Sequence, residues 1–168
     1  GNHSCGIDID GDVHCWGVDD GSYLDYGQVS DAPSGTFVQV SARFEHSCGI
    51  DIDGSVQCWG RDDYGQVSDA PSGIFVQVSA GGTHSCGVDI SGSVQCWGWD
   101  GDGESSPPSG QFVQISSSKH SNCAIKSSGI VHCWGNDDYG QVSDFPSGSF
   151  VQVSSGTYHS CGIDIGGV

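Results

Sequence analysis

Short runs in which hydrophobic and polar residues alternate follow one another along the chain, and Gly, Ser, Asp and Pro separate these runs. Between residues 37 and 68 the pattern predicts three strands, at 37–41, 46–52 and 55–60, and a short outer fourth strand at 65–68. No segment shows the 3.6-residue spacing of an amphipathic helix. The sequence therefore predicts an all-β protein built from units of four short strands.

The strand pattern repeats every 37 to 38 residues. Four of the repeats begin with Pro-Ser-Gly followed by Phe-Val-Gln-Val or Phe-Val-Gln-Ile, at Pro33, Pro71, Pro108 and Pro146. A β unit of about 38 residues buries too little apolar surface to fold alone, so neighbouring units are expected to stack. The predicted boundaries are a partial first repeat (1–32), three complete repeats (33–70, 71–107 and 108–145) and a partial fifth repeat (146–168), all in one continuous domain.

The central hairpin of each repeat can be registered from the sequence. In the second repeat, residues 52–54 fit a three-residue loop whose glycine adopts the left-handed conformation of a bulge. That loop places Cys48 opposite Cys58 and Ile50 opposite Val56 on the same face of the hairpin. Directly opposed cysteines have the short Cβ separation that a disulfide needs, so the hairpin is predicted to carry a cross-strand bridge.

The same ten-residue cysteine spacing occurs in four repeats and predicts four bridges: Cys5–Cys15, Cys48–Cys58, Cys86–Cys96 and Cys123–Cys133. Each bridge closes a short loop and is expected to contribute about 2 to 3 kcal/mol to stability. The position ten residues after Cys161 lies beyond the 168 residues of the sequence, and Cys161 is expected to be an unpaired thiol, to pair with a cysteine outside these residues, or to bridge to another chain. A cysteine framework of this kind is typical of secreted or cell-surface proteins.

The charge balance narrows the classes of partner. Lys and Arg total 4 against 21 Asp and Glu, which gives a formal net charge of -17. Phosphate backbones and anionic lipid surfaces should repel such a chain, so nucleic acid is excluded as the expected partner. No run approaches the roughly 18 apolar residues that a membrane helix requires, and no membrane insertion is expected.

Several motifs carry a resemblance to a known family. The run from Val78 to Val88, Val-Ser-Ala-Gly-Gly-Thr-His-Ser-Cys-Gly-Val, together with Cys-Trp-Gly and Asp-Asp-Tyr-Gly-Gln-Val in sister units, resembles the regulator of chromosome condensation (RCC1) repeat. The cysteines make it similar to bacterial extracellular versions of that repeat. The resemblance implies an extracellular β-propeller with four-stranded blades, in which the repeat histidine hydrogen-bonds inside its blade. Arg43, Ser121 and residues 102–106 depart from the repeat pattern.

Two sets of residues are candidate metal ligands. A histidine lies two positions before a cysteine at His3, His46, His84 and His159, on the same strand face, but the short Cys-x-x-Cys spacing of zinc sites is missing. The carboxylates of Asp8, Asp10 and Asp12 are weak calcium candidates, since no complete calcium-binding loop surrounds them. We therefore expect no cofactor, with structural histidines and mostly solvated carboxylates.

Aromatic residues supply the candidate binding surface. The tryptophans that follow the second cysteines, Trp16, Trp59, Trp97 and Trp134, recur at one blade position, which indicates packing between blades. Trp99 occurs in one unit only and is a candidate for an exposed contact. Tyr23 and Tyr26 lie in the five extra residues between the second cysteine of the first repeat and Pro33, and they join Trp99 as candidates.

The sequence favours a non-enzymatic function. No Gly-x-Ser-x-Gly elbow is present, and eight of the nine cysteines have predicted bridges. We expect an extracellular scaffold that self-assembles or presents a protein-interaction surface, with partners that include copies of itself paired through open blade edges. The alternatives are a soluble propeller that inhibits a protein or binds glycans, and a domain of a larger secreted hydrolase.

Overall fold

The computed structural model describes residues 1–166, which form thirteen strands, and no helix occurs among these residues. The strands are β1 (His3–Ile7), β2 (Val13–Gly17), β3 (Phe37–Arg43), β4 (His46–Asp51), β5 (Val56–Gly60), β6 (Phe75–Ala80), β7 (His84–Asp89), β8 (Val94–Gly98), β9 (Phe112–Ser117), β10 (Ser121–Lys126), β11 (Val131–Gly135), β12 (Phe150–Ser155) and β13 (Ser160–Asp164). The all-β prediction is confirmed.

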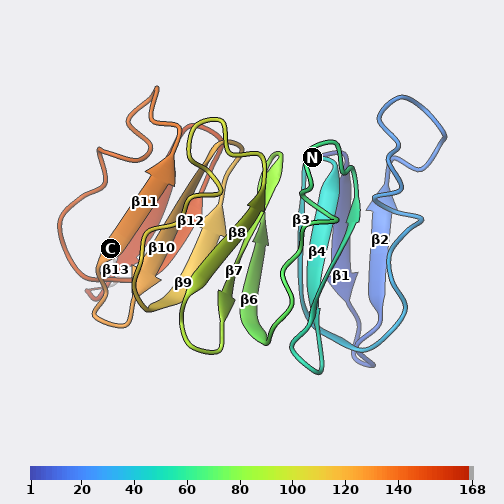
Figure 1. The fold of residues 1–168 in the computed structure, drawn as a ribbon, viewed down its shortest axis with the longest axis horizontal. Coiled ribbons are helices and arrows are strands. Elements are labelled where there is room, and N and C mark those ends of the chain that lie inside the picture. The colour runs from blue at the N-terminus through green and yellow to red at the C-terminus, as the bar shows by residue number, and fades with distance from the viewer. Residues whose placement is uncertain (167–168) are drawn as a thin grey trace.

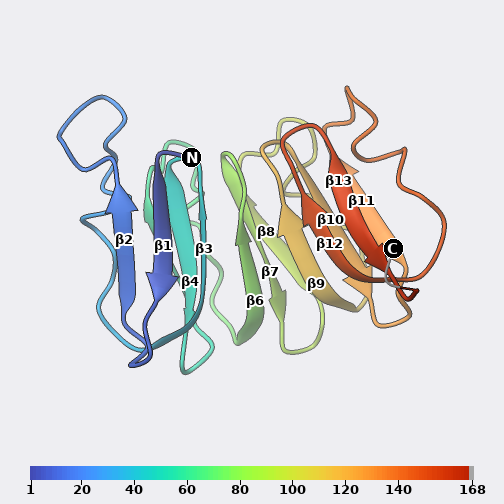
Figure 2. The ribbon, with the colours of Figure 1, turned by 180° about the vertical axis from the view of Figure 1, so that it is seen from behind.

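The strands form five small antiparallel sheets that correspond to the repeats, and we call these sheets blades 1 to 5. Blade 1 is β1-β2, blades 2, 3 and 4 are β3-β4-β5, β6-β7-β8 and β9-β10-β11, and blade 5 is β12-β13. Figures 1 and 2 show the blades stacked face to face in chain order, from blade 1 in blue to blade 5 in red. Among residues 1–166 the blades form an open row and do not close into a ring.

The hairpin register predicted for blade 2 is confirmed. Cys48 pairs with Cys58 and Ile50 with Val56 across β4 and β5, and Gly54 has a φ of 85° at the turn. The structure contains four disulfides, each between the two opposed cysteines of one hairpin, with Cα atoms 4.0 to 4.1 Å apart: Cys5–Cys15, Cys48–Cys58, Cys86–Cys96 and Cys123–Cys133. Blades 1 to 4 are thus each covalently locked.

The outer fourth strand expected at residues 65–68 is a succession of turns instead. The carboxylate of Asp62 accepts hydrogen bonds from the backbone N–H groups of Val67 and Ser68, at 2.9 and 3.0 Å. The side chain of Gln66, fully buried, accepts one from the N–H of Tyr64 at 2.9 Å. These side chains occupy the backbone donors that a strand would offer to its neighbour, which explains why the segment folds as turns.

The hydrophobic core lies between the blades, as the tryptophan pattern predicts. Trp97 of β8 is 5% exposed and packs on Cys48 and Ile50 of blade 2, where its Nε1 donates a 3.0 Å hydrogen bond to the carbonyl of Gln66. Trp59 and Trp134 are buried in the same way. Trp97 and Trp134 therefore each cover the disulfide of the preceding blade.

The repeat histidines also join successive blades, which corrects the expectation that each would bond inside its own blade. His46 Nε2 is hydrogen-bonded to Ser85 Oγ of blade 3, and His84 Nε2 to Asn122 Oδ1 of blade 4, both at 2.8 Å. The cause is alternation, because the histidine shares a strand face with the cysteine two residues later and that face meets the following blade. Burial lowers the pKa of His46 to about 3 and that of His84 to about 4.

Arg43, which departs from the repeat pattern, changes the structure locally. In blade 3 the corresponding residue is Gly81, and any Cβ there would collide with the ring of His84. In blade 2, β3 instead continues to Arg43 and the next residue, Phe44, adopts a φ of 46°. Arg43 Nη1 then donates to the carbonyls of Ser117 and Ser155, both at 3.2 Å, so that one side chain ties blade 2 to blades 4 and 5.

Candidate protein-interaction surfaces

The turns between the two cysteine-bearing strands of each blade lie along one side of the row of blades, which we call the hairpin end (Figure 1). Aliphatic side chains are exposed there: Ile90, at the hairpin apex of blade 3, is 71% exposed, and Val76 on β6 is 59% exposed. Together with Val113 on β9 they line a shallow hollow between blades 3 and 4. The repeat position of Val76 is also exposed at Val38 and Val151. The repeat position of Ile90 is also exposed at Ile9, Ile52 and Ile165. A row of exposed aliphatic residues is unusual on a chain this acidic.

The sequence contained a signal for this surface that pattern analysis missed. Strand alternation places Val76 on the face opposite the buried Phe75, and Ile90 lies at the apex of a hairpin, outside the paired register. Neither position was among the predicted site residues, although the repeat places Val76 one residue after a core phenylalanine and Ile90 in the hairpin loop.

The carboxylates proposed as calcium candidates lie in the turn of blade 1. Asp8 Oδ1 accepts hydrogen bonds from the backbone N–H groups of Asp10 and Asp12, both at 3.0 Å, and Asp8 Oδ2 lies 2.8 Å from His14 Nε2. The hydrogen bond to His14 is the main cause that holds the pKa of Asp8 below its usual range. Asp8 thus organises the turn. Within residues 1–166, no three His, Cys, Asp or Glu side chains are grouped as metal ligands.

The segments that follow Cys-Trp-Gly lie along the opposite side of the row, which we call the loop end (Figure 1). Side chains there pair across neighbouring blades. The Arg61 guanidinium lies 4.8 Å from the ring centre of Tyr26, and Trp99 packs edge to face on Tyr64 at 4.9 Å. Tyr139 and Tyr158 pack in the same way at 4.8 Å. These contacts help to hold consecutive blades together.

The three aromatic residues predicted as a binding surface therefore have different surroundings. Trp99 is partly covered by Tyr64, and Tyr26 is half-buried beside Arg61. Tyr23 is 84% exposed in the long loop of blade 1. The structure gives Tyr26 and Trp99 each a partner in blade 2 and leaves Tyr23 with the largest free surface of the three.

Glu104 stands in blade 3 where blades 1, 2 and 4 have the buried glutamines Gln28, Gln66 and Gln141. Its Oε2 accepts a 2.8 Å hydrogen bond from the N–H of Asp102. Its Oε1 is buried without a hydrogen-bond partner in the described part of the chain, and His120 Nδ1 lies 3.8 Å away. A buried carboxylate with an unsatisfied oxygen is costly.

Replacing Glu104 by glutamine removes the buried carboxyl group and restores the side chain of the sister blades. We expect Glu104→Gln to raise the free energy of unfolding by about 1 kcal/mol at pH 7, measured by urea denaturation. A fall in stability would show instead that the attraction between Glu104 and His120 outweighs the cost of burying the carboxylate.

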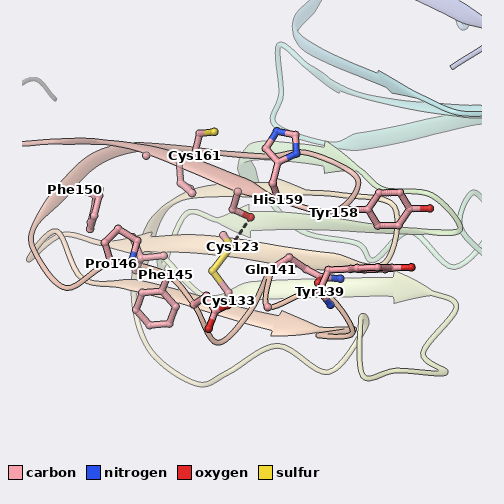
Figure 3. A pocket seen from close by; sticks show the side chains of 16 residues that line it. Cys123, Cys133, Tyr139, Gln141, Phe145, Pro146, Phe150, Tyr158, His159 and Cys161 are labelled. Atoms are coloured by element: carbon pink, nitrogen blue, oxygen red, sulfur yellow. Dashed lines mark hydrogen bonds between the residues drawn. A yellow bond between two sulfur atoms is a disulfide. The ribbon is translucent and has the colours of Figure 1, made fainter.

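A pocket opens between blades 4 and 5, beside β13 (Figure 3). Its walls are apolar: the disulfide Cys123–Cys133 and Val131 come from blade 4, Phe150 and Val153 from blade 5, and Phe145 from the loop between them. Tyr139 and Tyr158 lie at its loop end (Figure 3). The pocket was not predicted, because it depends on how two blades pack on each other.

Cys161 lies on β13 at the rim of this pocket, and it is the free cysteine of the described residues. Its side chain is exposed and points away from the disulfide Cys123–Cys133 (Figure 3). It occupies the position that Cys48 and Cys86 hold in their blades, where each faces a partner on the next strand.

Comparison with known proteins identifies the repeat. The family model described as regulator of chromosome condensation (RCC1) repeat matches residues 37–66, 75–104 and 112–141, more than half of the 168 residues. The chain belongs to the RCC1 repeat family. Each matched segment runs from the first strand of a blade to the buried glutamine or glutamate position of its loop, so each describes one blade. The resemblance seen in the repeat motifs is confirmed.

Solved structures share the fold of the chain. The ectodomain of the receptor kinase CR4 from Physcomitrella patens matches 98% of the chain with 27% identity and a TM-score of 0.77, and the CRINKLY WD40 ectodomain of the receptor kinase ACR4 from Arabidopsis thaliana matches 96% with 26% identity and a TM-score of 0.79. Yeast RCC1 (Prp20), solved bound to Kap60, matches 99% with 15% identity and a TM-score of 0.80. The chain is thus a row of RCC1 propeller blades.

These three structures are longer than the chain, which spans 45% of the first ectodomain, 62% of the second and 53% of yeast RCC1. None of the curated proteins compared with the chain matches it. The search for membrane-crossing helices among residues 1–166 found no helix with the length and apolar character required.

Proposed function

We propose that this chain is a non-enzymatic extracellular scaffold that binds a protein through its hairpin end. The observation that carries the proposal is the row of exposed aliphatic residues there, centred on the hollow lined by Val76, Ile90 and Val113. Large exposed apolar surfaces on soluble proteins mark sites of association. The four disulfides keep the blades rigid, so the surface is preorganised and little conformational entropy is lost on binding.

An extracellular setting is supported by two independent features. Four cross-strand disulfides persist only in an oxidising compartment in most organisms. The two solved ectodomains that match nearly the whole chain belong to receptor kinases. Yeast RCC1, which has the same fold, was solved in a complex with another protein, and a protein partner is likewise the class that we propose here.

Copies of the chain are a second class of partner, at blade 1, the first blade of the row. Strand β1 pairs with β2 alone in blade 1, and Trp16 is 59% exposed. An unpaired strand edge beside an exposed indole favours association through strand addition. Analytical ultracentrifugation should detect the resulting dimer, and Trp16→Ala should weaken it, whereas sedimentation as a monomer at all concentrations would exclude this partner.

The hairpin end is tested by replacing its aliphatic residues with threonine, which keeps the β-branched shape. We expect Val76→Thr/Ile90→Thr/Val113→Thr to lose the proteins that the wild-type chain retains from extracellular fluid of its source, with stability changed by no more than about 0.5 kcal/mol per site. Tyr23→Ser, exposed at the loop end, is the matched control and should retain them. Retention of the same proteins by the triple variant would refute the hairpin end as the contact surface.

A further inference from the structure

We propose that the loop end binds an arginine side chain of a partner protein at the boundary between blades 3 and 4, where Asp102 and Asp138 hold the guanidinium. The position is the one that Arg61 fills within the chain at the boundary between blades 1 and 2. The site lies on the side of the row opposite the hairpin end, and it is independent of whether that end binds a protein.

Arg61 shows how the chain itself holds a guanidinium group. Its Nη1 donates a 2.5 Å hydrogen bond to the carboxylate of Glu45, and its Nε donates one of 2.6 Å to Asp63. The ring centre of Tyr26, from the loop of blade 1, lies 4.8 Å from the guanidinium carbon. Two carboxylates and one aromatic ring therefore surround this guanidinium, which is a combination that arginine favours.

The boundary between blades 3 and 4 has the backbone of the same site. At blades 1 and 2, the N–H of Arg61 donates to the carbonyl of Glu45 at 2.8 Å. At blades 3 and 4, the N–H of Asn136 donates to the carbonyl of His120, also at 2.8 Å. Two residues after Asn136, Asp138 corresponds to the aspartate that pairs with Arg61. Asn136 therefore occupies the position of the arginine, and one of the two carboxylates is retained.

The preceding blade supplies a second carboxylate in place of the aromatic ring. The N–H of Tyr26 donates to Oε1 of Gln28 at 2.7 Å. In the same way, the N–H of Asp102 donates to Oε2 of Glu104 at 2.8 Å. Asp102 therefore holds the position of Tyr26. This exchange adds a carboxylate on the side of the site that is aromatic at blades 1 and 2.

The two carboxylates converge on one uncharged group. Oδ2 of Asp102 and Oδ2 of Asp138 accept hydrogen bonds from Nδ2 of Asn136, at 3.2 and 3.0 Å. Two negative charges this close repel each other, and an amide does not neutralise them. Both aspartates are exposed, so a group from another molecule can reach them. A guanidinium can donate to both carboxylates at once and neutralise one of the charges.

A third carboxyl group lies between two residues of the site. Glu104 is fully buried, and its Oε2 bonds to the N–H of Asp102. Its Oε1 lies 3.8 Å from Nδ1 of the half-buried His120 and has no hydrogen-bond partner in the described part of the chain. A buried carboxyl oxygen without a partner is unfavourable, and a nearby cation reduces that cost. The unpaired oxygen of Glu104 is therefore a second observation, separate from the exposed aspartates, that favours a bound cation here.

No lysine or arginine of the chain fills this site. The sequence has four such residues. Arg61 is paired with two carboxylates, and Arg43 donates to two backbone carbonyls of blades 4 and 5. The ammonium groups of Lys119 and Lys126 lie over phenylalanine rings, 5.9 and 5.5 Å from the ring centres. The positive charge at blades 3 and 4 must therefore come from another molecule.

The boundary between blades 2 and 3 is filled in a different way. Trp99 stands there in place of the arginine and packs edge to face on Tyr64 at 4.9 Å. Two residues later the chain has Gly101, so the aspartate of the other two boundaries is missing. This boundary has an indole and no pair of carboxylates. Paired carboxylates without a cation between them therefore distinguish blades 3 and 4.

Arginine fits this site better than a metal ion or lysine. The search for groups of three metal-ligating side chains found none among the residues that the structure describes. The planar fork of a guanidinium donates to two carboxylates at once, whereas a lysine ammonium is a compact point charge. The net charge of -17 attracts a basic partner. The partner class is thus a protein with an exposed arginine.

The experiment follows the backbone amide NMR signals of the chain during titration with the capped peptide acetyl-Gly-Arg-Gly-amide. We expect the signals of Asp102, Asn136 and Asp138 to shift, with an affinity about fivefold higher than for acetyl-Gly-Lys-Gly-amide. Asp102→Asn/Asp138→Asn should lose these shifts. The matched control Asp10→Asn/Asp53→Asn removes two exposed charges from the hairpin turns and should bind the arginine peptide like the wild type.

Asn136→Arg supplies the cation within the chain, as Arg61 does in blade 2. This variant should no longer bind the arginine peptide, and it should unfold at a higher urea concentration than the wild type. Equal affinity for the arginine and lysine peptides, or unchanged peptide binding by Asn136→Arg, would show an unspecific attraction to an acidic surface. Displacement of the arginine peptide by an equal concentration of calcium chloride would assign the site to a metal ion.

The hairpin-end variant Val76→Thr/Ile90→Thr/Val113→Thr should bind the arginine peptide like the wild type, because its substitutions lie on the other side of the row. Loss of its protein partners with normal peptide binding would separate the two proposals. Loss of peptide binding by this variant would show instead that the arginine site is not confined to the boundary between blades 3 and 4 at the loop end.

Discussion

Replacing Trp97 by alanine should lower the free energy of unfolding by about 3 to 5 kcal/mol, whereas Trp16→Ala should cost less than about 1 kcal/mol. The two residues occupy the same repeat position, but Trp97 is 5% exposed and Trp16 is 59% exposed. Trp97→Ala empties a site walled by Cys48, Ile50 and Phe75 and removes the hydrogen bond to Gln66. Both tryptophans follow the second cysteine of a disulfide-bridged hairpin. The difference in stability between the two variants therefore measures the effect of burial.

Urea denaturation followed by circular dichroism measures both variants, with the disulfides intact. The larger effect also tests how the blades depend on one another, because each core lies between two blades and not within one. If Trp97→Ala and Trp16→Ala lowered stability equally, the cores between blades would not be the main source of stability. A separate unfolding step for blades 1 and 2 in Trp97→Ala would locate the weakened contact at the boundary between blades 2 and 3.

The sequence was sufficient to predict features that depend on neighbours along the chain. The hairpin register followed from the loop of residues 52–54, and with it the opposition of Cys48 and Cys58. The repeat period and the alternating face of Trp59 together predicted packing between blades. These features are local or repeat identically, so one unit contains the information for all of them.

Features that depend on the next blade were predicted less well. The hydrogen bond of His46 was expected inside its blade, but its partner Ser85 is 39 residues away, and alternation alone does not name the facing residue. The turns at 65–68 depend on the Asp62 side chain, which competes with strand pairing. The pocket beside Cys161 depends on how blades 4 and 5 pack on each other, which the repeat pattern of one blade does not specify.

Acidification from pH 8 to pH 5 should lower the free energy of unfolding by about 4 kcal/mol through His46 and His84. Burial is the main cause that lowers the pKa of His46 to about 3 and that of His84 to about 4, whereas an unfolded histidine titrates near 6.5. Below about pH 6.5 the unfolded chain takes up protons that the folded chain does not, so stability is present above that value and is lost as the pH falls. At pH 5 each histidine has lowered the free energy of unfolding by about 2 kcal/mol, because the pKa values of both histidines in the folded chain lie below that pH.

The histidine effect can be separated from that of the carboxylates by the pH window and by substitution. Acidic groups whose folded pKa is lowered, such as Asp8 and Asp137, change stability only near and below about pH 4, outside the range from 8 to 5. His84→Ser introduces the residue that blade 4 carries at Ser121, and it should remove about half of the pH dependence while lowering stability at pH 8. Urea denaturation at constant ionic strength provides the measurement. If the free energy of unfolding of His84→Ser changed with pH as much as that of the wild type, His84 would be protonated in the folded chain. The contact between blades 3 and 4 would then need a charged imidazole.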